Sequence, residues 1–540
     1  MVELKLSRTF IGEHLSIEHQ EALLDLSKTL VSSEIIEASS DDIILSNACA
    51  FSLPISFWQN LENCQNFIRS LSPHFRDKIL STLECESIED CSSVNELKMA
   101  IHNTFKIDTN QPKVASSEPI STFKSISPPE VRFKDLKPYQ TRLSEQVWQH
   151  LNLSAFSKCV LQMPTGTGKT RTSIDVICRF FNECEDGIQI VWLCNTEELA
   201  DQALQTFIDT YSFLANKTVL AKNCMRNKMP LSAFNSQFLV ASIQSIGAKN
   251  NEESRAAIAR LGVDVSRLKA VILDEAHIAT APTYRNALEA LTEDGSALLG
   301  LTATPGRERE SDSSSANSEF AKFFNQNVFK LQFEGKDTIE ELMSRQIMSR
   351  SSSHPIEGCS VSNMLSEKEI ERMTEDKVIP KRLINLISAD NSRNATIISL
   401  LSHLLKSNKK IIYFGTSVEQ SQLVSNSLSL LGHSSAHVDG SSGSCRSLNI
   451  HRYRNGDIQC LCNYGVLSTG FDDPKTDVVF IARITNSIVL YSQMIGRGLR
   501  GEMLGGTQKC DIYTVIDNIT DLPENKDIYN YFQGFFERHD

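Results

Sequence analysis

Residues 163–170 have the composition of a loop that binds phosphate groups. They follow an apolar run at 159–162 and precede a helical pattern that begins at Arg171, which is the order of a strand, a glycine loop and a helix. Such a loop directs its backbone N–H groups toward the phosphates of a nucleotide, and the start of the next helix adds a positive dipole end. Its lysine can reach the outer phosphates, and its last threonine can hold Mg²⁺. Met163 stands where the strict pattern has glycine. The residues expected to bind ATP here are Thr165, Gly166, Thr167, Gly168, Lys169 and Thr170.

An acidic motif, Asp274-Glu275-Ala276-His277, ends an apolar run at 268–273 that is typical of a buried parallel strand. Open α/β sheets bind ligands at the carboxyl ends of their strands. Asp274 is therefore placed to hold the Mg²⁺ that Thr170 also contacts, and Glu275 is placed to orient or deprotonate an attacking water. A charged loop after a strand is the plainer alternative. The presence of both motifs in this order favours ATP hydrolysis.

These motifs, with others in the same order, resemble those of superfamily 2 helicases and translocases of the DEAH-box kind. Within that superfamily the chain looks most like the restriction-enzyme helicase subunits and the RadD-like repair helicases. The resemblance extends from about residue 133 to about residue 517. It implies an ATP-dependent helicase, a nucleic-acid-stimulated ATPase that uses ATP and Mg²⁺.

The resemblance assigns roles to four further segments of the first half. Residues 136–140 resemble the adenine-reading element, and residues 302–305 resemble the segment that couples hydrolysis to strand movement. Residues 195–199 and 241–245 occupy two nucleic-acid contacts, although Glu197 and Glu198 stand where the family often has a basic residue. The residues implied are Gln140 at the adenine, Asn195, Thr196, Ser242 and Gln244 at the nucleic acid, and His277, Thr302 and Thr304 in coupling.

Two segments of the second half complete the resemblance. Residues 463–472 resemble the fifth motif of the family, and residues 493–500 resemble the sixth. Arginines matter in the sixth because phosphoryl transfer spreads negative charge over the γ-phosphate oxygens, and a planar guanidinium can meet two of them. A surface salt bridge is the alternative for an isolated arginine pair. The implied residues are Ser468 and Thr469 at the nucleic-acid backbone, Gly470 and Asp472 at the nucleotide, and Gln493, Arg497 and Arg500 in catalysis.

The pattern of strands and helices around these residues predicts an α/β fold. Strand and helix patterns alternate through 132–330 and 331–540, which indicates two tandem RecA-like domains with doubly wound parallel sheets. Residues 1–107 show helical periodicity and are interpreted as a mainly helical accessory domain. The segment 108–131 is interpreted as a linker because it is rich in Ser, Pro and Lys. ATP is expected to bind between the two RecA-like domains and to favour their closure.

Composition limits the cellular setting. The 540 residues suffice for three or four domains of about 150 residues each. No apolar run reaches the length of about 18 residues that would predict a membrane span, and no secretory signal pattern is visible. The 14 cysteines form no Cys-x-x-Cys pair. Two of them, in Cys460-Leu461-Cys462, are expected to share one face of a strand in the core. We therefore expect a cytoplasmic protein with no membrane partner.

The net charge of −12 is concentrated near the N-terminus. Residues 1–110 carry 17 acidic and 8 basic side chains, a net charge of −9, which leaves −3 for the remainder. This acidity disfavours duplex DNA as a ligand of residues 1–107 and favours a protein partner. The near-neutral remainder can bind nucleic acid through local basic and backbone N–H groups. Arg446, Arg452 and Arg454 form either part of such a basic patch or a solvated helix face.

Two classes of function stay open. The first is a motor, a helicase or duplex translocase that acts on nucleic acid, with DNA favoured over RNA, in bacterial DNA repair or anti-phage defence. The second is an ATP-driven sensor or clamp that activates a partner effector without unwinding. A metal nuclease at Asp90, Glu96 and Lys98 is a further alternative, but Ser92-Ser93 before Glu96 better fits a capped helix start.

Overall fold

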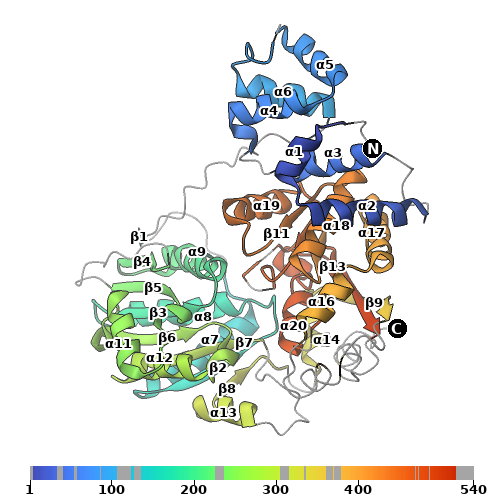
Figure 1. Ribbon diagram of the computed structural model, residues 1–540. Helices are drawn as coiled ribbons and strands as arrows, with labels where there is room; N and C mark the ends of the chain where they lie inside the picture. The colour runs from blue at the N-terminus through green and yellow to red at the C-terminus, as the bar shows by residue number, and fades with distance from the viewer. Residues whose placement is uncertain are drawn as a thin grey trace.

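The computed structural model describes residues 4–32, 40–53, 57–85, 87–105, 107, 123–126, 135–225, 236–303, 315–333, 336–360, 366, 369, 379–468, 470–471, 473–485 and 487–518. They form a helical N-terminal region and two domains, each built on a largely parallel sheet with helices on both faces (Figure 1). The fold class predicted from the sequence is confirmed. Among the helices of the described ranges, none is long and apolar enough to cross a membrane.

The N-terminal region is helical, as expected from its periodicity. Local side chains cap several of these helices. The Ser7 hydroxyl accepts a hydrogen bond from the Phe10 N–H, and the Asn60 side chain accepts one from the Asn63 N–H. Such caps satisfy backbone donors that a helix start leaves without a partner. The helices are α1 (Arg8–His14), α2 (Ile17–Ser32), α3 (Asp41–Ser52), α4 (Leu61–Ser70), α5 (Pro73–Leu83) and α6 (Val94–Phe105).

Helices α2 and α3 pack on the second domain, against α17 (Asn391–Lys406) and α18 (Val418–Leu430) (Figure 1). Leu23 of α2 and Ile44 of α3 are buried, and they line a small cavity together with Leu430. Buried apolar side chains of α2, α3, α17 and α18 belong to one hydrophobic cluster. The N-terminal region therefore shares a core with the second domain.

The first domain contains an eight-stranded sheet in the order β1-β4-β5-β3-β6-β7-β2-β8. All neighbours are parallel except β1, which pairs antiparallel with β4 at the edge. Strand β1 lies inside the segment interpreted as a linker. The strands are β1 (Phe123–Ile126), β2 (Lys158–Gln162), β3 (Gln189–Cys194), β4 (Val219–Asn223), β5 (Ser236–Ser242), β6 (Leu268–Leu273), β7 (Ala297–Thr302) and β8 (Val328–Lys330).

Both faces of this sheet are covered, which explains its continuous apolar strands. Along β3, Ile190 and Trp192 belong to the cluster under α7, α8 and α9, whereas Val191 and Leu193 belong to the cluster under α11 and α12. This alternation follows from the two-residue period of a strand. The helices of the domain are α7 (Pro138–Leu153), α8 (Lys169–Glu183), α9 (Glu197–Leu214), α10 (Ile243–Ile246), α11 (Asn251–Arg260), α12 (Pro282–Thr292) and α13 (Ser315–Phe323).

The second domain contains a six-stranded parallel sheet in the order β11-β12-β10-β13-β14-β9. Cys460 and Cys462 lie on one face of β12, with their sulfur atoms 3.8 Å apart, in the core as predicted. The elements are α14 (Thr338–Ser344), β9 (Arg350–Ser360), α16 (Lys381–Ser388), α17, β10 (Ile411–Phe414), α18, β11 (Ser435–Val438), α19 (Gly443–Asn455), β12 (Cys460–Asn463), β13 (Val478–Ile481), α20 (Ile488–Ile495) and β14 (Lys509–Asn518).

Candidate functional site

The 163–170 loop joins β2 to α8, as the sequence predicts. Gly166 and Gly168 have φ angles of +84° and +89°, a backbone conformation that glycine adopts without a steric penalty. The Lys169 ammonium donates to the Met163 carbonyl at 3.2 Å, so its side chain lies along the loop. Met163 is fully buried in the hydrophobic core. Its departure from glycine therefore extends the core up to the start of the loop.

Two side chains of α7 support this loop from behind. The Tyr139 hydroxyl and the Gln140 amide both donate to the Thr167 carbonyl, at 2.9 and 3.3 Å. The Gln140 carbonyl oxygen accepts from the Lys137 N–H at 2.9 Å. A Cβ atom at Gly168 would lie only 2.3 Å from the Gln140 amide nitrogen, so the loop requires glycine there. The amide of Gln140 holds the loop, and its contact with adenine stays a prediction.

The acidic motif lies at the carboxyl end of β6, beside the loop. Asp274 is 7% exposed, and its pKa is raised to about 7 because it is buried and lies near Glu275. Burial lowers the pKa of Lys169, while the charges of Glu275 and Asp274 oppose that shift. The His277 Nδ1 atom lies 3.4 Å from a Glu275 carboxylate oxygen. These four groups form one electrostatic cluster.

The coupling segment meets the start of the 163–170 loop at the end of β7. Thr302 is the last residue of β7, is fully buried, and accepts a hydrogen bond at its carbonyl from the Met163 N–H at 3.1 Å. The start of the 163–170 loop and the end of β7 are thus held together by backbone. Thr304, also predicted for coupling, lies outside the described residues, as do Thr469 and Asp472.

The 493–500 segment of the second domain packs directly on the 163–170 loop. A Cβ atom at Gly496 would lie 2.5 Å from the Thr165 Cβ, and one at Gly166 would lie 3.4 Å from the Arg500 Cγ. Gln493, one turn earlier on α20, is buried. Residues from the two halves of the chain therefore meet, as expected from the sequence, at one interface between the two domains, which we call the seam.

The two arginines of this segment have different surroundings. The Arg497 guanidinium donates to the Ser468 carbonyl at 2.8 Å and also to the Phe471 carbonyl, and its Nε donates to the Gln493 carbonyl at 3.2 Å. Arg497 thus holds the 463–472 segment in place. Arg500 packs its aliphatic stem near Gly166; the charges of both arginines act on Lys169, and that of Arg497 also acts on Asp274.

The predicted nucleic-acid contacts lie on neighbouring strands. Cys194 and Ser242 are register partners at the ends of β3 and β5, which brings Asn195 beside Ser242 at the carboxyl edge of the sheet. The Thr196 hydroxyl accepts from the Leu199 N–H at 3.3 Å and caps α9. The Ser242 hydroxyl accepts from the Gln244 N–H in the same way, and Gln244 itself is exposed. Ser468 is buried.

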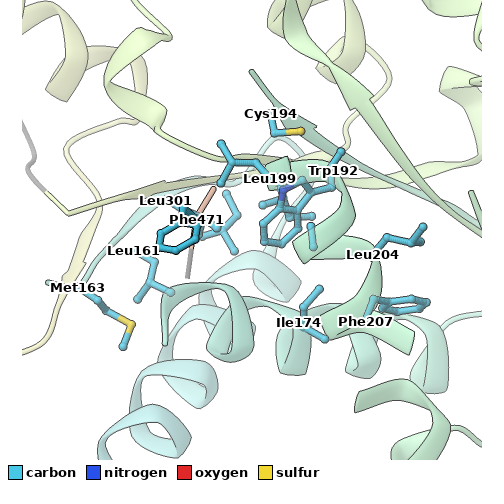
Figure 2. Close-up of a cluster of buried hydrophobic side chains, with 14 of the residues drawn as sticks. Leu161, Met163, Ile174, Trp192, Cys194, Leu199, Leu204, Phe207, Leu301 and Phe471 are labelled. Carbon is cyan, nitrogen blue, oxygen red and sulfur yellow. The ribbon is translucent and has the colours of Figure 1, made fainter. Parts of the chain in front are cut away.

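Sequence reasoning missed a contact between the domains at the start of α9. The Arg446 guanidinium of α19 lies 2.9 Å from the Glu198 carboxylate, and the side chains are 17% and 29% exposed. A Cβ atom at Gly470 would lie 3.0 Å from the Leu199 nitrogen. Figure 2 shows Phe471 in the hydrophobic cluster that also holds Leu199. The signal for this contact in the sequence was Glu198, an acidic residue at a position where the family often has a basic one.

The N-terminal nuclease alternative has a structural explanation instead. The Ser93 hydroxyl accepts a hydrogen bond from the Glu96 N–H at the start of α6, and Lys98 is buried. The Asp90 carboxylate accepts from the backbone and hydroxyl of Ser87. These contacts are those of a capped helix and a turn.

Comparisons with known proteins identify both domains. Residues 133–307 match the family described as "Type III restriction enzyme, res subunit", and residues 393–502 match the family described as "Helicase conserved C-terminal domain". The chain belongs to the superfamily 2 helicases. As a helicase of this superfamily it is an ATP-dependent enzyme related to restriction-enzyme subunits, which confirms the family expected from the motifs.

Individual relatives of this helicase are distant. It is 24% identical over 387 residues to a "51.5 kDa protein" of Lactococcus phage (isolate 7-9), covering 70% of this chain and 71% of the relative. It is 24% identical to IRC3, a Saccharomyces cerevisiae protein assigned as an ATP-dependent helicase, over 63% of this chain and 46% of that protein. The ATP-dependent Type ISP restriction-modification enzyme LlaBIII, solved bound to DNA, aligns with 75% of this chain and 30% of its own, at 16% identity and a TM-score of 0.50.

Proposed function

We propose that this helicase hydrolyses ATP at the seam between its two RecA-like domains and uses the resulting domain movement to unwind nucleic acid or to translocate along a duplex. DNA is the favoured substrate. One observation carries the proposal. The segments expected to bind ATP and those expected to bind nucleic acid both meet across the same seam, Gly496 on Thr165 in one place and Gly470 on α9 in the other.

The first domain supplies the groups that hold ATP. Lys169 meets the outer phosphates, and Glu275 orients or deprotonates the attacking water. The Asp274 carboxylate and the Thr170 hydroxyl are hard oxygen ligands of the kind that suit Mg²⁺, and Asp274 is buried. Across the described ranges no group of three acidic, histidine or cysteine side chains could hold a metal alone. Mg²⁺ bound here would complete its coordination with water and phosphate oxygens, and it would neutralise charge on the phosphates.

The second domain supplies the positive charge for the transition state. Arg500 lies beside Gly166, and we assign it as the arginine finger. Arg497 acts as a positioning residue because its guanidinium bonds two carbonyls of the 463–472 segment. ATP favours the closed seam, and loss of the γ-phosphate weakens that preference. A ligand shifts such an equilibrium only by its differential affinity for the two states.

The decisive measurement is the ATPase rate in the presence of single-stranded, duplex and forked DNA and the matching RNAs. We expect DNA to stimulate the wild-type rate, Lys169→Ala to abolish turnover, and Glu275→Gln to bind ATP without hydrolysing it. Strand-displacement and triplex-displacement assays then separate unwinding from translocation. A rate that no polynucleotide changes would refute the proposal.

A sensor or clamp that activates a partner is the second candidate. It is favoured by the packing of α2 and α3 on α17 and α18, which links the acidic N-terminal region to the second domain. Stimulated ATPase without displacement in either assay would support it. A cytoplasmic role in bacterial DNA repair or anti-phage defence is in keeping with the similarity to restriction-enzyme subunits.

A further inference from the structure

Arg483 forms a cation–π pair with Tyr464; Tyr464 belongs to the 463–472 segment, whereas Arg483 lies outside every motif assigned above. Arg483 is the second residue after β13, and Tyr464 is the first after β12. The guanidinium carbon lies 4.9 Å from the centre of the tyrosine ring, within the range of a cation–π contact. Both side chains are partly exposed, so a ligand can reach them.

The sheet order places this pair over the start of α18. Strands β12 and β13 flank β10, so a contact between residues that follow them spans the carboxyl end of β10. The backbone there is well held, because the Ala482 carbonyl accepts from the Arg393 guanidinium at 2.8 Å and from the Thr416 hydroxyl at 2.9 Å. Arg483 therefore projects from a rigid edge of the second domain.

Arg483 forms no ion pair with the described residues. Within the described ranges, no carboxylate lies within ion-pair distance of its guanidinium, while nearby Asp517 pairs with Arg393 and Asp439 with His437. Burial lowers the pKa of Arg483, and the neighbouring group that acts on it is Tyr464. Arginine nevertheless keeps its proton at neutral pH. Burying a cation without a paired carboxylate is costly, so an anion bound beside Arg483 would offset that cost.

The position of the pair favours a nucleic-acid phosphate over a bound nucleotide as its ligand. Gly496, after the C-terminus of α20, touches the 163–170 loop, whereas Arg483 precedes the N-terminus of α20. A helix of 8 residues is about 12 Å long. Arg483 thus lies at the far end of α20 from the ATP seam. Tyr464 is also the second residue of the 463–472 segment, which carries Ser468, one of the expected nucleic-acid contacts.

We propose that Arg483 binds a backbone phosphate of single-stranded nucleic acid and that the Tyr464 ring holds the guanidinium in place for it. This inference rests on the proposed function, since it adds a contact to the same nucleic-acid path. Aromatic rings beside basic groups are a common construction in single-strand binding sites.

The test is fluorescence-anisotropy binding of a labelled single-stranded oligonucleotide to the full chain at several salt concentrations. Loss of a hydrogen-bonded phosphate contact should weaken binding by Arg483→Gln about tenfold. It should also reduce the slope of log affinity against log salt by about 0.7. Arg483→Lys should retain the wild-type slope, and Tyr464→Ala should weaken binding about threefold. Arg255→Gln removes the same charge from an ion pair on α11, and we expect it to bind like the wild type.

Each other outcome has a distinct meaning. If Arg483→Gln lowers the melting temperature but leaves the salt slope unchanged, the pair only stabilises the fold, and the inference is overturned. The proposed function would still stand. If the wild type binds none of the tested polynucleotides, the proposed function fails, and this inference fails with it.

Discussion

The separate surroundings of Arg497 and Arg500 lead to a prediction that distinguishes a positioning residue from an arginine finger. Truncating Arg497 to alanine removes two hydrogen bonds to the carbonyls of Ser468 and Phe471. A hydrogen bond from a charged donor contributes about 1.5–3 kcal/mol, and the lower value applies because water can reach a half-buried site. The two bonds together then contribute about 3 kcal/mol.

This loss should appear as a lower melting temperature. For a domain of about 200 residues, each kcal/mol shifts Tm by about 2–4 °C, so Arg497→Ala should unfold about 6–12 °C below the wild type. The hydrogen bonds to the Ser468 and Phe471 carbonyls come from Arg497. Arg500→Ala should melt close to the wild type but lower the nucleic-acid-stimulated kcat by about 10³.

The assay combines thermal unfolding with steady-state ATPase kinetics on the same preparations. Arg497→Lys is the matched control, because it keeps the charge but cannot bridge both carbonyls, and it should melt like Arg497→Ala. The reasoning is wrong if Arg500→Ala turns over ATP at the wild-type rate, or if Arg497→Ala melts normally and alone loses turnover.

Three further predictions concern the seam and the N-terminal region. Gly496→Ala should lower the ATPase rate without unfolding the protein, because its methyl group would lie 2.5 Å from the Thr165 Cβ; circular dichroism provides the folding control. Since burial raises the pKa of Asp274 to about 7, Mg²⁺ must displace a proton there below about that pH. The affinity for MgATP should therefore fall about tenfold per pH unit below that pKa and level off above it, and calorimetry of Asp274→Asn should show a flat profile. Leu23→Ala should lower the free energy of unfolding by about 2–4 kcal/mol in a denaturant titration, whereas Ile17→Ala, exposed on the same helix, should change it little.

Much of the fold follows from the sequence because the functional motifs lie at strand ends. An apolar run that ends in a glycine loop or in an acidic pair fixes both a buried parallel strand and its carboxyl edge, as β2 and β6 do here. The order of the motifs then fixes two domains. The short strand β1 was missed because its four residues, Phe-Lys-Ser-Ile, do not alternate between apolar and polar and lie in a Ser- and Pro-rich segment.

Contacts between distant segments could not be predicted in the same way. Glu198 and Arg446 are far apart in the chain, and their pairing depends on how the domains meet. The position of Arg497 under the 463–472 segment depends equally on tertiary packing, since its motif spacing alone is the same for a positioning residue and for a finger. The contacts of Gln140 could not be predicted from the sequence, because its amide both caps α7 through Lys137 and holds the Thr167 carbonyl of the loop.

The core shared by α2, α3, α17 and α18 has a mechanical consequence. Because these helices are joined by buried apolar side chains, α2 and α3 would move together with the second domain as one unit if the seam opens or closes. A protein bound to α2 and α3 would therefore have to move with the second domain. Its binding or release could slow or free that movement at a position far from the ATP site.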